Sequence, residues 1–174
     1  MALYRPACIE DESYREALAR LIEGGYPPLS ARLLANRGIT DPDSAALFLD
    51  PSVERLADPL RIPDMDRSVS RIREALTHGE RMTVYGDYDV DGVTASVLLY
   101  RVLKAMGADI RIYVPDRHSE GYGLHGDAIR AIAEEGIDLI ITVDCGIHAI
   151  PEARIAAECG VDLIITDHHE CGEG

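Results

Sequence analysis

The stretch "RMTVYGDYDVDGVTASVLLYRVLKAMG", residues 81–107, decides the fold, because it joins a strand to a helix through an acidic turn. Residues 81–86 include β-branched and aromatic side chains, which are typical of a strand. Residues 93–107 carry apolar side chains at helical spacing. The sequence predicts that one apolar face of this helix holds Ala95, Leu98, Leu99, Val102 and Met106.

The alternation of strand and helix continues along the chain. The next predicted elements are a strand at 109–115, a helix at 125–136, a strand at 137–144, a helix at 149–160 and a strand at 161–167. Strands that are almost continuously apolar and linked by helices are typical of a parallel sheet covered on both faces. The sequence therefore predicts an α/β fold built on a doubly wound parallel sheet.

A small helical region is expected before this sheet. Residues 1–63 are predicted to form short helices and a proline-marked link, and residues 64–174 to form the α/β domain. The expected helix boundaries are Gly24 and Gly25 as a stop, Pro28 as a first-turn residue, Gly38 as a C-cap, and Asp41 with Pro42 as a start.

Polar side chains gather where each predicted strand ends. They are Asp87, Asp89 and Asp91 after the first strand, Asp116 and Arg117 after the second, Asp144 after the third, and Asp167, His168 and His169 after the fourth. Ligands of open parallel sheets bind outside the carboxyl ends of the strands. Because four strand ends supply these side chains to one edge, a merely solvated acidic turn does not explain them.

Two of these strands nearly repeat each other. "IDLIITVD" at 137–144 and "VDLIITDH" at 161–168 align at an offset of 24 residues, which places Asp144 opposite His168. The alternative is that two β-α units share a strand composition and nothing more. The polar residues at both strand ends favour a functional site.

The acidic turn also matches the first six positions of an EF-hand calcium loop, counted from Asp87. Position twelve of such a loop must be a bidentate glutamate, and here it is Leu98. An EF-hand loop follows a helix, whereas this turn follows a predicted strand. Both observations exclude a calcium loop.

Aspartate oxygens with one or two imidazoles suit Mn²⁺ or Mg²⁺, and less specifically Zn²⁺ or Fe²⁺. Several carboxylates can share a small volume where cations neutralise them. Two cations about 3.5 to 4 Å apart, bridged by one carboxylate, promote in-line displacement at phosphorus. The sequence has no G-x-S-x-G, no G-x-x-x-x-G-K-[ST], and no G-x-G-x-x-G after its first sheet strand, which disfavours acyl transfer and nucleotide-binding loops.

The bulk composition narrows the function classes. A formal net charge of −14 over 174 residues argues against a simple nucleic-acid-binding surface, unless metal ions attract the phosphates. No apolar run approaches the roughly 20 residues of a membrane span, so we expect no membrane association and a cytoplasmic location. The cysteines have no C-x-x-C spacing and are expected to be reduced: Cys8, Cys145, Cys159 and Cys171. A zinc site from Cys145, Cys171 and nearby histidines is the alternative, although its spacing fits no familiar pattern.

The motifs "DYDVDG", "VDCG" and "DHH", in that order on successive β-α units, resemble the DHH phosphoesterase superfamily. Within it, "VPDRHSEGYGL" and the N-terminal "YPPLSARLLANRGI" and "IPDMDRSVSRI" are similar to the RecJ family of single-strand-specific exonucleases. The resemblance covers nearly the whole chain. It implies a two-metal phosphodiesterase that removes nucleotides from the 5′ end of single-stranded DNA in DNA repair and recombination.

The resemblance also implies roles for individual residues. The implied catalytic residues are Asp87, Asp89, Asp91, Asp144, His168 and His169. The implied ligands of two Mn²⁺ or Mg²⁺ ions are Asp89, Asp91, Asp144, Asp167 and His168, with Asp144 as the bridge. The implied substrate contacts are Arg117, Tyr122, His125 and His169. For Tyr122, base stacking and plain packing both stay open.

The sequence departs from the family pattern at two points. Cys145 stands where many relatives have Asn after the aspartate of the third motif. Family members continue after the fourth motif with a further metal-binding Asp and a second domain that grips the substrate. We therefore expect an N-terminal fragment, with a DHH domain incomplete at its C-terminal end and inactive alone.

Two other functions stay open at this stage. One is a phosphodiesterase that acts on short oligonucleotides or cyclic dinucleotides, and the other is a non-catalytic DHH scaffold in replication. Non-catalytic domains lose ligands, whereas this sequence keeps all of Asp89, Asp91, Asp144 and His168. The implied partners are single-stranded DNA, a single-strand-binding protein and a helicase.

Overall fold

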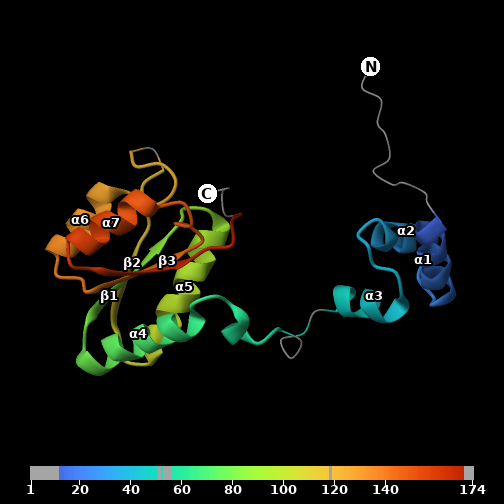
Figure 1. Cartoon of the computed structure of the whole chain (residues 1–174), viewed down its shortest axis with the longest axis horizontal. Helices are drawn as coiled ribbons and strands as arrows, with labels where there is room; N and C mark the ends of the chain where they lie inside the picture. The colour runs from blue at the N-terminus through green and yellow to red at the C-terminus, as the bar shows by residue number, and fades with distance from the viewer. Residues whose placement is uncertain (1–11, 51, 53–55, 118, 171–174) are drawn as a thin grey trace, which may run out of the picture. The chain divides into compact units, whose positions relative to one another are not determined.

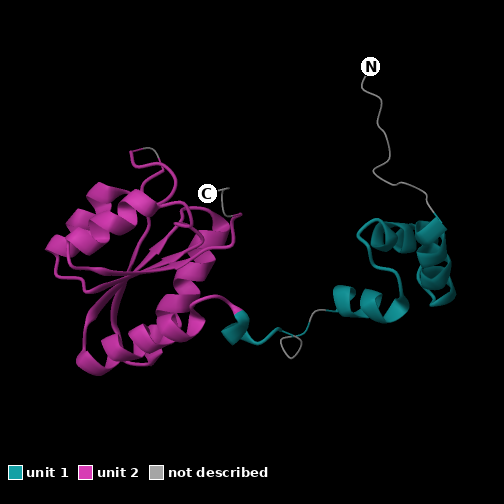
Figure 2. Ribbon diagram, viewed as in Figure 1, with its two compact units in different colours: residues 1–61 teal, residues 62–174 magenta. Residues whose placement is uncertain are grey.

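The computed structural model describes residues 12–50, 52, 56–117 and 119–170 of the chain (Figure 1). The chain divides into two compact units, residues 1–61 and 62–174 (Figure 2). Two of the four cysteines, Cys8 and Cys171, lie outside the described residues. Among the described residues, no helix combines the length and apolar character that crossing a membrane would require.

The first unit is a small helical cluster. Its elements are α1 (Glu12–Glu23), α2 (Pro28–Ala35), α3 (Pro42–Leu49) and the 3₁₀ helix η2 (Pro59–Arg61). Its buried core is formed by Leu21, Ala31, Leu34 and Ala45. Helical structure before the sheet was predicted from the sequence, and the structure confirms it.

The helix boundaries in this unit follow the expected capping rules. The carboxylate of Asp41 accepts a hydrogen bond from the backbone N–H of Ser44 at 2.8 Å, and Pro42 opens α3. Pro28 opens α2, and Gly25 and Gly38 have φ angles of 91° and 77° after α1 and α2. These predicted boundaries are confirmed.

The second unit alternates helices and strands. Its elements are α4 (Met65–His78), β1 (Arg81–Gly86), α5 (Val90–Ala105), β2 (Asp109–Tyr113), α6 (Gly126–Glu134), β3 (Leu139–Val143), α7 (Ile150–Glu158) and β4 (Asp162–Thr166). The four strands pair in parallel in the order β2-β1-β3-β4. Helices α4 and α5 cover one face of the sheet, and α6 and α7 cover the other (Figure 1). The doubly wound α/β fold is therefore confirmed.

Each strand divides its side chains between two cores. Val84 and Ile141 face α4 and α5, whereas Tyr85 and Ile140 face α6 and α7. Every residue of β3 is buried, as expected for a central parallel strand. The apolar runs in the sequence follow from this burial on both faces.

Three of the five residues on the predicted apolar face of α5 are exposed. Leu98, Val102 and Met106 are 67%, 48% and 59% exposed, and the buried residues of α5 are Gly92, Ser96 and Leu103. Helix α5 approaches β1 so closely that a Cβ at Gly86 would lie 2.0 Å from Oγ of Ser96. The helix therefore faces the strand with its small residues. Close backbone approach, rather than hydrophobic periodicity, sets the rotation of this helix.

The order of the strands places a ligand-binding position between β1 and β3. The chain leaves β1 for β2 on one side and returns to β3 on the other side, so the two connections diverge at the carboxyl ends of β1 and β3. Gly86 of β1 pairs in register with Val143 of β3. Asp87 and Asp144, which follow these two residues, therefore leave the sheet side by side.

Candidate metal centre at the carboxyl edge of the sheet

The acidic turn after β1 is held in place by the carboxylate of Asp89 and by a glycine. Oδ1 of Asp89 accepts the backbone N–H groups of Asp91 and Gly92, both at 2.9 Å, and so caps α5. A Cβ at Gly92 would lie 2.6 Å from the backbone nitrogen of Asp87, so the close approach of α5 requires glycine there. The side chain of Asp87 is buried by this approach.

Asp87 has an unsatisfied polar atom in this buried position. The residue is 3% exposed, and its Oδ1 has no hydrogen-bond partner among the described residues. A buried carboxylate oxygen without a partner is costly unless another group, such as a cation, compensates it. This atom is one of the strongest indications of a cation site at the edge.

Asp144 leaves β3 in a conformation that is uncommon for a residue other than glycine. Its φ angle is 63°, and its backbone N–H donates to the carbonyl of Thr166 at 3.0 Å. Aspartate tolerates this left-handed region better than most residues, and such backbone strain is often found at functional sites. The conformation directs the carboxylate toward the turn after β4.

The environment of Asp144 favours its protonated form. Burial raises the pKa of Asp144, and the nearby carboxylate of Asp89 raises it further, which outweighs the opposing effect of His168. Two carboxylates this close repel each other unless a cation lies between them. A carboxyl pKa raised by burial and by a second carboxylate is typical of a site whose charge a cation would neutralise.

Asp167 organises the turn after β4 rather than facing outward. Its side chain is 1% exposed and accepts the backbone N–H groups of Ile147, His168 and His169 at 3.0, 2.8 and 3.1 Å. Burial raises the pKa of Asp167, but these hydrogen bonds and that of the His169 ring outweigh burial, so the net shift is downward. Asp167 therefore stays ionised and ties the turn after β4 to the turn after β3.

The ionised Asp167 also fixes the tautomer of His169. Nδ1 of His169 lies 2.6 Å from Oδ1 of Asp167, and an ionised carboxylate can only accept a hydrogen bond. Nδ1 must then carry a proton, and the hydrogen bond to Asp167 raises the pKa of His169. When the ring is neutral, Nε2 is the atom left with a free lone pair.

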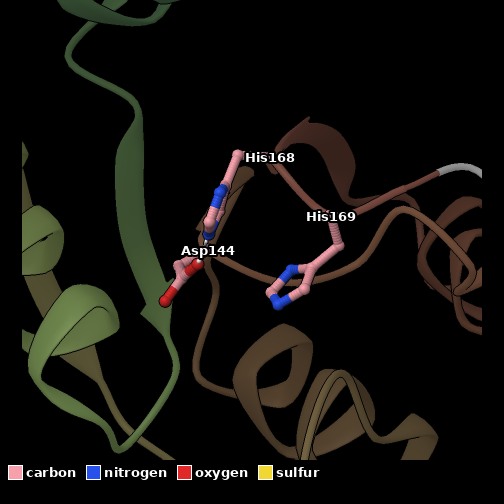
Figure 3. Close-up of side chains that lie close together, drawn as sticks. All are labelled: Asp144, His168 and His169. Carbon is pink, nitrogen blue, oxygen red and sulfur yellow. Dashed lines mark ion pairs between the residues drawn. The ribbon is translucent and has the colours of Figure 1, made fainter. Parts of the chain in front are cut away.

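Two groups of potential metal ligands overlap at Asp144. Within each group the ligand atoms lie within 4.8 Å of one another: Asp87 with Asp89 and Asp144, and Asp144 with His168 and His169. Figure 3 shows the ring of His168 directed at Asp144, with His169 leaving the same turn. Nε2 of His168 is 2.9 Å from Oδ1 of Asp144. The donor set of carboxylate oxygens and imidazole nitrogens fits Mn²⁺ or Mg²⁺.

Two further predicted ligands take different positions. Asp91 lines a cavity of about 560 Å³ together with Thr94, Asp144 and His168, but it belongs to neither ligand group among the described residues. Asp167 also belongs to neither group among the described residues, and its oxygens accept hydrogen bonds from backbone N–H groups of two turns. Their assignment as ligands remains a prediction.

The predicted substrate residues are brought to the edge to different degrees. The hydroxyl of Tyr122 lies 3.3 Å from Nδ1 of His169 and 3.4 Å from the carbonyl oxygen of Asp144. Burial, followed by the charge of Asp167, raises the pKa of Tyr122 to about 12. The guanidinium carbon of Arg117 lies 5.3 Å from the ring centroid of Tyr88, within the acidic turn.

His125 and Cys145 are less directly connected to the edge. His125 is the residue before α6, and its Nε2 is buried without a hydrogen-bond partner among the described residues. Cys145 is fully buried, its Sγ lies 3.8 Å from the carbonyl oxygen of Tyr85, and burial raises its pKa to about 12. Among the described residues, no group of potential metal ligands includes a cysteine.

Three comparisons with known proteins agree with this geometry. A sequence model of the DHH family, N-terminal domain, matches residues 81–174. The single-stranded-DNA-specific exonuclease RecJ of Bacillus subtilis is 46% identical over 145 residues, which cover 83% of this chain and 18% of that protein.

The comparison with solved structures also finds RecJ proteins. RecJ of Thermus thermophilus in complex with Mn²⁺ matches with a TM-score of 0.67 and 32% identity, over 93% of this chain and 22% of that one. The same protein in complex with Mg²⁺ matches with a TM-score of 0.53 and 29% identity, over 90% of this chain and 18% of that one. The chain thus spans about a fifth of the length of these relatives.

Proposed function

This chain belongs to the DHH family, and on that premise we propose that the edge described above is a two-cation centre that hydrolyses single-stranded DNA from its 5′ end. The observation that carries the proposal is Asp144, which is common to both ligand groups. A carboxylate shared by two cations suits in-line displacement at phosphorus. The Mn²⁺ and Mg²⁺ in the matched RecJ structures support the choice of cations.

The residues at the carboxyl edge of the sheet would form two cation-binding positions. Asp87 and Asp89 would hold one cation, His168 and His169 would hold the other, and Asp144 would contact both. When bound, such cations lower the pKa of a coordinated water and stabilise charge on the phosphoryl oxygens. They would also compensate the unpartnered oxygens of Asp87 and Asp144.

The remaining polar residues would bind and orient the substrate. Asp167 fixes the ring of His169, so that Nε2 would bind a cation when the ring is neutral or donate to a phosphate oxygen when the ring is protonated. Arg117 would pair with a phosphate, because guanidinium matches phosphate geometry and Tyr88 holds it beside the acidic turn. Asp91 would complete the coordination from the cavity that it lines.

The proposed nuclease activity also suggests a biological role. A nuclease of this type would act in DNA repair and recombination, where a single-strand-binding protein and a helicase would supply single strands. We expect the cations to provide the attraction for DNA, because the chain itself has a net charge of −14.

The direct test is hydrolysis by the full-length gene product with Mn²⁺. Single-stranded DNA labelled at the 5′ end should lose its label first, compared with the same strand labelled at the 3′ end. Cyclic dinucleotides, dinucleotides and pyrophosphate are the competing substrates. Faster turnover of any of these would overturn the exonuclease assignment, and failure to bind Mn²⁺ by calorimetry would indicate a scaffold instead.

A further inference from the structure

We propose that Tyr85 and Tyr113 are positioning residues, whose hydroxyl groups hold the loop between β2 and α6 so that Arg117 and Tyr122 face the substrate. The inference rests on the proposed function and extends it to residues that no sequence motif marks. The described residues of this loop, between Val114 and His125, form turns and irregular backbone. Its position must therefore come from contacts with the sheet.

Tyr85 anchors the loop directly after Tyr122. The side chain extends from β1 toward α6 and α7 and is fully buried. Its hydroxyl donates to the carbonyl oxygen of Gly123 at 3.2 Å, and Gly123 has a φ angle of 91°. The buried hydroxyl of Tyr85 thus has an acceptor, and the carbonyl oxygen of Gly123 has a donor.

Tyr113 anchors the loop on the other side of Tyr122. Its hydroxyl, at the end of β2, donates to Oε2 of Glu120 at 2.5 Å, while Oε1 of Glu120 accepts the backbone N–H of Asp116 at 3.0 Å. The hydrogen bond from Tyr113 lowers the pKa of Glu120, so the acceptor stays ionised. Glu120 therefore connects the sheet to the backbone next to Arg117.

The two tyrosines act as one unit. Their ring centroids are 5.0 Å apart with an interplanar angle of 31°. Burial raises the pKa of Tyr113 to about 12, so its hydroxyl keeps the proton that it donates to Glu120. Phenylalanine would pack equally well at either place, so the hydroxyls are needed for the loop rather than for the core.

The anchored loop joins the substrate residues to the metal edge. Strand β1 carries Tyr85 and leads into the acidic turn, while Tyr122 reaches His169 and the carbonyl of Asp144. The distance between a phosphate held by Arg117 and cations held by Asp144 would therefore depend on the two hydroxyls. Loss of either hydroxyl would weaken the contact of Arg117 with the phosphate and so lower the affinity for substrate, while the cation ligands stay in place.

The test compares Tyr85→Phe and Tyr113→Phe with Tyr100→Phe in the full-length protein. Tyr100 lies on α5 against the opposite face of the sheet and is the matched control. Each test variant should raise the KM for a single-stranded oligonucleotide about three- to tenfold, the range for one lost hydrogen bond. The kcat and the Mn²⁺ affinity should stay within about twofold, because the metal ligands are untouched. Hydrogen exchange at residues 119–124 should become faster.

A second arm separates positioning from plain stability. In an Arg117→Ala background the effect of Tyr113→Phe on KM should largely disappear, because Tyr113 acts through Glu120 on the backbone next to Arg117. An undiminished effect in that background, or a lower Tm with an unchanged KM, would overturn the inference while the nuclease assignment stands. A wild-type protein without single-strand hydrolysis would instead overturn the proposed function, and the inference with it.

Discussion

Nε2 of His168 lies 2.9 Å from Oδ1 of Asp144, yet the two atoms are not aligned as a hydrogen bond, and Oδ1 has no other hydrogen-bond partner among the described residues. A neutral imidazole nitrogen and a carboxylate oxygen are both lone-pair donors. Two such donors this close together, without a hydrogen bond between them, suit a shared cation. The first prediction follows from this pair.

Asp144→Asn should reduce turnover of the full-length protein by at least about 100-fold, a scale typical of losing one group that stabilises the transition state. Asparagine keeps the size of the side chain and tolerates the φ angle of 63°, so the change removes charge more than shape. Mn²⁺ titration calorimetry should show weaker binding. Asp109→Asn, at the start of β2 on the opposite edge, is the matched control and should keep both properties.

Near-normal turnover of Asp144→Asn would place the bridging ligand elsewhere. Loss of activity in Asp109→Asn as well would point to a general effect of removing carboxylates.

Gly92→Ala should destabilise the domain by about 1–3 kcal/mol or more, because the new Cβ would lie 2.6 Å from backbone atoms of Asp87, which cannot move aside. Gly126→Ala is the matched control. Its Cβ would also meet an atom at 2.6 Å, but that atom is the end of the flexible Ile155 side chain. Thermal unfolding should show a clearly lower Tm for Gly92→Ala alone. Equal Tm values for the two variants would mean that α5 can shift away from β1.

The fold was predictable because strands that are buried on both faces have nearly continuous apolar sequences. Four of the five buried residues of β3 are apolar and the fifth is Thr142, and such nearly continuous runs differ from the helices, whose apolar residues recur at helical spacing. The rotation of α5 was not predictable in this way. It depends on Gly86, Gly92 and Ser96, and small residues at a close contact leave no mark on hydrophobic periodicity.

The location of the candidate site was predictable, because the site residues directly follow the predicted strands. Asp87, Asp89, Asp144, His168 and His169 were expected at one edge, and the structure brings them into two overlapping groups. Their chemical roles remain predictions. The sheet pairs Val143 with Thr166, so the residue that follows in register with Asp144 is Asp167, whereas the alignment of the two strands predicts His168.

The role of the Tyr85 and Tyr113 hydroxyl groups could not be predicted from the sequence, for a physical reason. A buried tyrosine and a buried phenylalanine look alike in an apolar strand, and the partner of the hydroxyl is known only once the chain is folded. The same applies to Asp167, whose hydrogen bonds to three backbone N–H groups depend on two separate turns.

Asp167 should make the stability of the metal-free protein depend on pH. Its folded-state pKa lies below the ordinary value of 3.8, so its contribution to the free energy of unfolding is fully present above that value and is lost as the pH falls through the folded pKa. Asp167→Asn should therefore lower the Tm near neutral pH, at a cost of about 1–3 kcal/mol for hydrogen bonds to a charged group. The difference from wild type should shrink between about pH 5 and about pH 2. Thermal unfolding in EDTA measures it, and a difference that stays constant down to acid pH would show that the charge of Asp167 is not what stabilises the turn.

Removal of divalent cations should abolish most binding of single-stranded DNA. The sheet edge without cations presents the carboxylates of Asp87, Asp89 and Asp144 to an incoming phosphate, on a chain whose net charge is −14. Cations reverse the local sign and give the phosphates a positive site within a negative molecule. In the full-length protein, fluorescence anisotropy with a labelled oligonucleotide should therefore show at least about a tenfold loss of affinity in EDTA, with recovery on adding Mn²⁺. Asp144→Asn should recover less than wild type at the same Mn²⁺ concentration, whereas Asp109→Asn should recover fully. Equal DNA affinity with and without Mn²⁺ would mean that Lys and Arg side chains elsewhere make the phosphate contacts, in which case the affinity should instead fall steeply with added salt.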